Sequence, residues 1–191
     1  MSYNEKVKQR ILDGDLSKPT ELYPLLIDEL ARDKVEVVKF INIQMKLKNY
    51  VACSILDVGG ANGRMVSGID IPVKIVIDKR AFDQLPGVSY IHQEYGHDLS
   101  VADVTMFSEF LHLFSLENIE KFIKKCQSRY IIVVENKYDD FLDLRLRLWS
   151  GGACIPEGFL NELTGTKPYY VNGYGVWIFK NKNWSESNEI T

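Results

Sequence analysis

The chain has 191 residues, of which 46% are hydrophobic and 26% charged, and its formal net charge is −3. This length suits one domain with a sizeable core, and the composition is that of a globular rather than a disordered protein. The acidic balance gives no general attraction to phosphate backbones and provides no strong nucleic-acid signal, although a local patch can still recognise one RNA or DNA.

The three cysteines, Cys53, Cys126 and Cys154, are odd in number, widely spaced and form no CxxC pair. They favour neither a disulfide framework nor a zinc site, and free thiols fit a reducing compartment. The N-terminus is polar without the apolar segment of a secretory signal, and no apolar run approaches the length of a membrane span. We therefore predict a cytoplasmic protein with no membrane segment and no bound metal.

Helical patterns occupy residues 1–50, which we predict to form an N-terminal helical extension. Leucines recur at helical spacing after Thr20, which can cap a helix, and a second apolar pattern mixed with lysines spans 35–47.

From Cys53 onward, short β-rich runs alternate with helical segments. The predicted strands are 54–56, 74–77, 88–92, 104–107, 130–134, 169–171 and 176–180, and the predicted helices are 62–69, 116–125, 139–149 and 156–163. Such alternation indicates βαβ units, a parallel sheet and a ligand crevice at the carboxyl ends of the strands.

The last two predicted strands are separated only by Asn172-Gly173-Tyr174-Gly175, which is typical of a hairpin. The chain therefore predicts a three-layer α/β/α, Rossmann-like fold, with a seven-stranded, mostly parallel sheet that ends in an antiparallel hairpin. Residues 51–182 form this domain, and residues 183–191 form a frayed tail.

The sharpest motif is Asp57-Val58-Gly59-Gly60-Ala61-Asn62-Gly63, which follows an apolar strand and precedes a helix. Glycines without a Cβ permit a tight turn and a close approach of a ligand. The motif is no phosphate-binding P-loop, and the GxGxxG spacing of dinucleotide sites is absent. The alternative is a glycine-rich turn that binds nothing.

The second strand also ends in an acid, Asp78. A carboxylate at this position can accept hydrogen bonds from both hydroxyls of a ribose. The alternative is a solvated aspartate at a strand end, although two acids at neighbouring strand ends after a glycine turn favour a site.

At this point the chain resembles the class I S-adenosylmethionine-dependent methyltransferases, and most nearly the small-molecule O-methyltransferases. The glycine motif is similar to the first motif of that family. The segment 85–94 resembles its third strand, 102–115 its fourth strand with a Leu-His turn, and 130–135 its fifth strand.

The resemblance implies a role for each matching residue. Residues of the cofactor site are Asp57, Gly59, Gly60 and Gly63 in the loop, Asp78 on the ribose, Glu94 on the adenine edge and Tyr95 stacked beside the adenine. His112 falls at the position of the catalytic base and Glu135 near an acid that orients it. A packing role for His112 and a plain polar strand end for Glu135 are the alternatives. In this interpretation the N-terminal extension is a lid or a cap over the acceptor site.

The resemblance predicts an enzyme that transfers a methyl group from S-adenosylmethionine to a small or planar nucleophile. Oxygen is favoured over nitrogen as the acceptor atom. One alternative is a catalytically silent methyltransferase-like binding or stimulatory subunit, which would have a protein partner. Another is an RNA methyltransferase of the cap type, against which the acidic charge balance counts. A nicotinamide oxidoreductase is the weakest alternative because the phosphate-binding spacing is missing.

Overall fold

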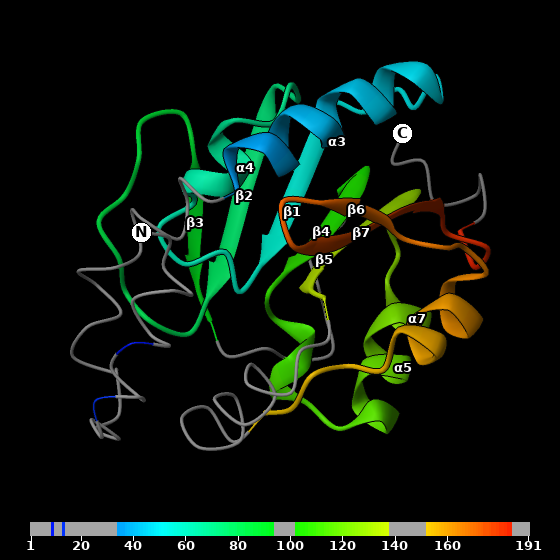
Figure 1. Ribbon diagram of the computed structural model, residues 1–191. Helices are drawn as coiled ribbons and strands as arrows, with labels where there is room; N and C mark the ends of the chain where they lie inside the picture. Colours follow the sequence, from blue (N-terminus) through cyan, green and yellow to red (C-terminus); the bar gives the residue numbers. More distant parts are fainter. Residues whose placement is uncertain (1–8, 10–12, 14–33, 94–101, 138–151, 185–191) are drawn as a thin grey trace.

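The computed structural model describes residues 34–93, 102–137 and 152–184, together with Gln9 and Asp13. Its seven strands form one sheet in the order β3-β2-β1-β4-β5-β7-β6 (Figure 1). The strands are β1 (Ser54–Val58), β2 (Val73–Asp78), β3 (Ser89–His92), β4 (Val104–Ser108), β5 (Tyr130–Asn136), β6 (Tyr169–Val171) and β7 (Tyr174–Lys180). Strands β1 to β5 are parallel, and β7 runs antiparallel to both β5 and β6. The predicted mostly parallel sheet with a terminal hairpin is confirmed.

The terminal hairpin turns more tightly than predicted. Its two turn residues, Asn172 and Gly173, have φ angles of 48° and 83°. Positive φ at both central residues is typical of the type I′ turn, whose twist matches that of the paired strands. Strand β7 therefore begins at Tyr174, and the prediction that it begins at residue 176 was wrong.

Helices cover both faces of the sheet, as the three-layer prediction requires (Figure 1). Helices α3 (Val35–Leu47) and α4 (Arg64–Ser67) pack on one face, and α5 (Leu116–Lys125) and α7 (Glu157–Thr164) pack on the other. Helix α4 is a single turn, shorter than the predicted 62–69, because Asn62 and Gly63 still belong to the preceding loop. The predicted helix 139–149 lies outside the described residues.

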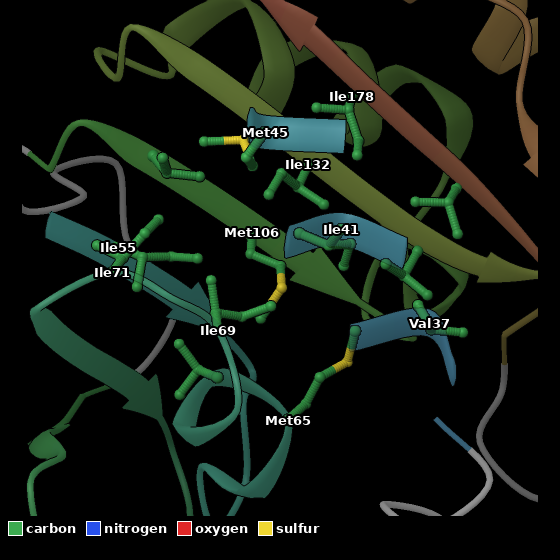
Figure 2. Packing of buried hydrophobic residues seen from close by; sticks show 14 of the residues in the cluster. Val37, Ile41, Met45, Ile55, Met65, Ile69, Ile71, Met106, Ile132 and Ile178 are labelled. Carbon is green, nitrogen blue, oxygen red and sulfur yellow. The ribbon is translucent and has the colours of Figure 1, made fainter. Parts of the chain in front are cut away.

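Helix α3 is part of the hydrophobic core. Val37, Ile41 and Met45 recur every four residues on its buried side and share one cluster with Met106 and Ile132 of the sheet (Figure 2). Burial of each such side chain contributes about 1.5–3 kcal/mol. This packing fixes the first residues of α3 over the carboxyl ends of the strands. Most of residues 1–33, and residues 185–191, lie outside the described part, so the lid and the frayed tail stay predictions.

Polar side chains gather at the carboxyl ends of the parallel strands, on both faces of the sheet. Alternation places Asp57, Ser108 and Asn136 on the face covered by α3, because each lies two residues beyond a member of the α3 cluster. Glu135 lies on the face covered by α5. The strand ends therefore bring together acids that are far apart in the sequence.

Within the described residues, no helix combines the length and apolar character needed to cross a membrane.

Candidate functional site

The loop between β1 and α4 is held in a left-handed backbone conformation. Gly59, Ala61 and Gly63 have φ angles of 73°, 50° and 74°. The amide of Gly59 donates a hydrogen bond of 2.7 Å to the carbonyl of Ile77, which draws the loop onto the end of β2. Ala61 adopts this conformation despite its Cβ, at a cost of about 1–2 kcal/mol.

The three glycines of the loop make room for side chains of the protein itself. A Cβ on Gly59 would lie 2.3 Å from the ring of Phe110, and one on Gly60 would lie 2.5 Å from the carboxylate of Asp57. A Cβ on Gly63 would lie 2.7 Å from the hydroxyl of Tyr90. That hydroxyl donates a 2.6 Å hydrogen bond to the carbonyl of Asn62 and so braces the loop.

Asp57 is a fully buried carboxylate whose two oxygens have no hydrogen-bond partner in the described part of the chain. Its pKa is raised to about 7, mainly by burial; the charge of Lys34 acts to lower this pKa and that of Asp78 acts to raise it. A buried polar group without a partner costs free energy. A ligand that brings a hydrogen-bond donor or a positive charge to this carboxylate would offset that cost.

Asp78 ends β2 and faces the same loop. Its Oδ2 accepts a 3.1 Å hydrogen bond from the amide of Ala61, and its Oδ1 accepts one of 2.9 Å from the amide of Arg80. The Arg80 side chain lies 3.5 Å from Oδ1. A carboxylate offers about four acceptor positions, so Asp78 keeps capacity for a further donor.

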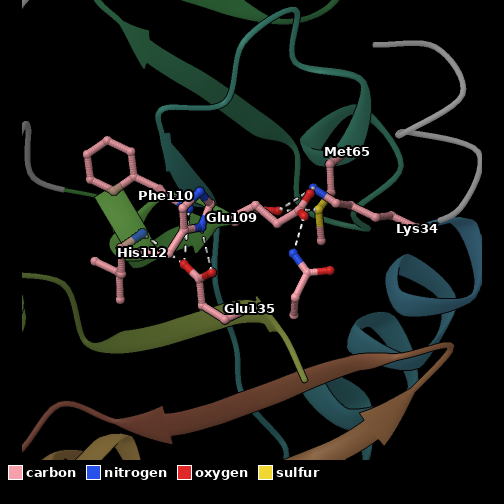
Figure 3. Close-up of polar contacts among 9 residues, drawn as sticks. Lys34, Met65, Glu109, Phe110, His112 and Glu135 are labelled. Carbon is pink, nitrogen blue, oxygen red and sulfur yellow. Dashed lines mark hydrogen bonds and ion pairs between the residues drawn. The ribbon is translucent and has the colours of Figure 1, made fainter. Parts of the chain in front are cut away.

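His112 and Glu135 form a hydrogen-bonded pair at the same edge of the sheet, with Glu135 on the face covered by α5 (Figure 3). His112 lies in the short 3-10 helix η2 (Leu111–Leu113), and its Nδ1 is 2.9 Å from Oε2 of Glu135. Oε1 of Glu135 accepts hydrogen bonds from the amides of Phe110, at 3.1 Å, and Leu111, at 2.8 Å. One carboxylate therefore fixes both the backbone turn and the ring. A neutral ring with its proton on Nδ1 presents Nε2 as the basic nitrogen.

Lys34 and Glu109 also reach this edge (Figure 3), and so does Asn136; the sequence did not predict any of the three as site residues. The Lys34 ammonium lies 2.5 Å from Glu109, whose other carboxylate oxygen accepts from the amide of Asn136. Glu109 follows β4 directly, so its place at a strand end was a signal that could have identified it. Lys34 gave no such signal, because it precedes a helical pattern that is far from the strands in the sequence.

The predicted adenine contacts, Glu94 and Tyr95, lie outside the described residues, and their roles stay predictions. The structure brings the other predicted residues into two groups: Asp57 and Asp78 at the glycine loop, and His112 with Glu135 at the turn after β4.

No protein-family profile matches the chain, and no curated protein sequence matches it.

Solved structures do match. The mitomycin 7-O-methyltransferase MmcR aligns with a TM-score of 0.54 and 14% identity, over 68% of this chain and 49% of that one. An O-methyltransferase family protein from Burkholderia thailandensis aligns with a TM-score of 0.58 and 12% identity, over 83% of this chain and 60% of that one. NcsB1, an O-methyltransferase from neocarzinostatin biosynthesis, aligns with a TM-score of 0.56 and 14% identity, over 90% of this chain and 63% of that one.

The chain therefore has the fold of the class I methyltransferases, and the predicted resemblance is confirmed at the level of the fold. It spans between about half and two thirds of the length of these structures. The solved NcsB1 structure is a complex with S-adenosylmethionine and 2-hydroxy-5-methyl naphthoic acid.

Proposed function

We propose that the protein is an S-adenosylmethionine-dependent methyltransferase that acts on an oxygen nucleophile of a small, planar acceptor. The observation that carries the proposal is the buried carboxylate of Asp57, which has no hydrogen-bond partner among the described residues, beneath a glycine loop in a class I methyltransferase fold. A site of this kind calls for a ligand with donors and positive charge, and S-adenosylmethionine brings both.

The residues at the edge fit the parts of this cofactor. Asp57 receives the α-ammonium of the methionine end, which supplies the missing donor. Asp78 accepts hydrogen bonds from the ribose hydroxyls with the capacity that its loop contacts leave. The resemblance adds Glu94 on the adenine edge and Tyr95 beside the adenine ring.

The cofactor, when bound, supplies an activated methyl group on its sulfonium. The chain orients the acceptor and manages its proton. Nε2 of His112 takes the proton from the acceptor hydroxyl, and Glu135, 2.9 Å from Nδ1, stabilises the imidazolium that forms. Glu135 thus both stabilises the charged His112 ring and positions it, since the same carboxylate also holds the turn on which His112 lies.

The acceptor class is supported by the fold neighbours. NcsB1 was solved with a hydroxynaphthoic acid, a planar molecule with a hydroxyl group. The hydrogen-bonded His112–Glu135 pair is suited to accepting a proton from such a hydroxyl, because the carboxylate stabilises the charged imidazole.

Calorimetric titration of the purified protein tests the cofactor assignment. S-adenosylmethionine and its demethylated product should both bind in the micromolar range, whereas NAD, as the control, should give no heat. Binding of NAD in preference to both would refute the proposal in favour of an oxidoreductase.

A second candidate is a methyltransferase-like binding or stimulatory subunit that has lost the cofactor. The hydrogen bonds that the Ala61 and Arg80 amides donate to Asp78 favour this candidate, since they give the Asp78 carboxylate partners without a ligand. Absence of heat with both sulfur compounds would support this candidate, and affinity capture of a stable partner would then identify its function.

A further inference from the structure

Lys34 is a buried lysine that reaches the site from outside the βα units. It precedes α3, is 5% exposed, and extends its side chain to the end of β4 (Figure 3). Its Nζ lies 2.5 Å from Oε2 of Glu109, donates a 3.2 Å hydrogen bond to Oγ of Ser108, and lies 5.8 Å from the centre of the Tyr174 ring. A buried ammonium is stable only with such partners.

Glu109 holds this ammonium in place. Its own backbone is fixed at a φ of 50°, and its amide donates a 2.8 Å hydrogen bond to the carbonyl of Val134. Although burial acts to raise the pKa of Glu109, the charge and hydrogen bond of Lys34 hold it below its usual range. Glu109 is therefore ionised at neutral pH and holds the Lys34 ammonium beside it.

The same face of the sheet edge carries Asp57, which has no hydrogen-bond partner in the described parts of the chain. In the parallel register of β1 with β4, Asp57 lies opposite Met106, two residues before Ser108, to which Lys34 donates its hydrogen bond. A lysine ammonium has three N–H donors, and two of those on Lys34 are directed at Ser108 and Glu109. Within residues 34–93, 102–137 and 152–184, this face of the edge thus presents a carboxylate without a donor and an ammonium with a further N–H to donate.

We infer that Lys34 binds the α-carboxylate of S-adenosylmethionine while Asp57 receives its α-ammonium, an assignment that rests on the proposed function. An amino-acid end carries one anion and one cation side by side, and Lys34 and Asp57 offer the complementary pair. Helix α3 then contributes directly to the cofactor site, and Ser108, Glu109 and Asn136 are positioning residues for its lysine.

The test compares two ligands that differ only in this carboxylate, S-adenosylmethionine and decarboxylated S-adenosylmethionine. In calorimetric titration, Lys34→Met should weaken binding of the first by about ten- to a hundredfold, the effect of losing one charge-assisted hydrogen bond. Its affinity for the decarboxylated compound should stay at the wild-type value. Lys39→Met is the matched control, because Lys39 is an exposed lysine of the same helix that pairs only with Glu36 among the described residues, and it should leave both affinities unchanged.

Equal losses for the two ligands, or no loss for either, would overturn the assignment, since Lys34 would then only support the fold. Failure of the wild-type protein to bind either ligand would overturn the proposed function itself. Lys34→Met leaves Glu109 buried without its cation, so the comparison is repeated with the Lys34→Met/Glu109→Gln double variant. That variant removes both charges and should show the same selective loss of affinity for S-adenosylmethionine, with affinity for the decarboxylated ligand unchanged.

Discussion

Replacement of Asp57 with asparagine should stabilise the ligand-free protein above neutral pH. The carboxylate is fully buried, without a hydrogen-bond partner among the described residues, and its pKa rises from 3.8 to about 7 on folding. At 1.36 kcal/mol per pKa unit, this shift makes the ionised carboxylate about 4 kcal/mol unfavourable to folding. Asparagine keeps the shape and removes the charge.

The sign of the pH dependence follows from proton binding. Between the unfolded and the folded pKa, the folded protein holds the proton that the unfolded chain has released, so raising the pH favours unfolding. The penalty is absent below about pH 4 and complete above about pH 7. The stability advantage of Asp57→Asn over wild type should therefore grow by about 2–3 kcal/mol from about pH 5 to about pH 8.

Urea unfolding of both proteins at these two pH values measures that growth. The asparagine amide is also unpaired, but its cost does not change with pH and cancels in the comparison. Asp70→Asn is the control, because the Lys46 side chain lowers the pKa of this exposed aspartate. Its ionised form is favoured in the folded protein, so this substitution should give no stability advantage that grows with pH. An advantage that is the same at both pH values would show that Asp57 is not a destabilising charge in the folded protein. Asp57→Asn should also weaken binding of S-adenosylmethionine, which separates stability from function.

Three further substitutions test the other parts of the site. Asp78→Ala should weaken binding of S-adenosylmethionine by about 1–3 kcal/mol, the cost of unpaired ribose hydroxyls, and unchanged affinity in calorimetry would refute the ribose role. His112→Ala should preserve that affinity and lower turnover of an accepted substrate by roughly 10²–10⁴, whereas a loss below about tenfold would make His112 a structural residue. Gly59→Ala should lower the unfolding free energy by about 2–4 kcal/mol, because φ is +73° and the new Cβ would overlap the Phe110 ring. The matched control is Gly173→Ala, where φ is +83° but the space around the new Cβ is open, so only the smaller conformational cost is expected. An equal loss of unfolding free energy in both variants would show that overlap with Phe110 is not the cause.

Much of the fold could be predicted from the sequence because its signals are local. The alternation of apolar strands with amphipathic helices predicts a parallel sheet, and the helix over 35–47 and that over 116–125 have the predicted bounds. A glycine-rich turn after an apolar strand, and acids such as Asp57 and Asp78 at strand ends, are recognisable in a few consecutive residues. The carboxyl ends of parallel strands meet at one edge, so these residues could be expected to lie together.

The sequence also suggested His112 and Glu135, but only through resemblance. No local rule joins a histidine after β4 to a glutamate at the end of β5. The 2.9 Å contact between them depends on the register in which Ser108 pairs with Val134.

Only the tertiary structure decided what surrounds Asp57. Asp57 has no hydrogen-bond partner among the described residues because of how the site packs: an aspartate at a strand end is usually solvated, whereas this one is fully buried beside the glycine loop. The contact of Lys34 with Ser108 joins residues 74 positions apart. Periodicity places Lys34 at the start of a helix, but only the burial of Val37 and Ile41 against the sheet brings its ammonium to the strand ends. The sequence pattern thus determined the strands, the helices and the acids at the strand ends. Long-range packing determined which charged side chains come into contact.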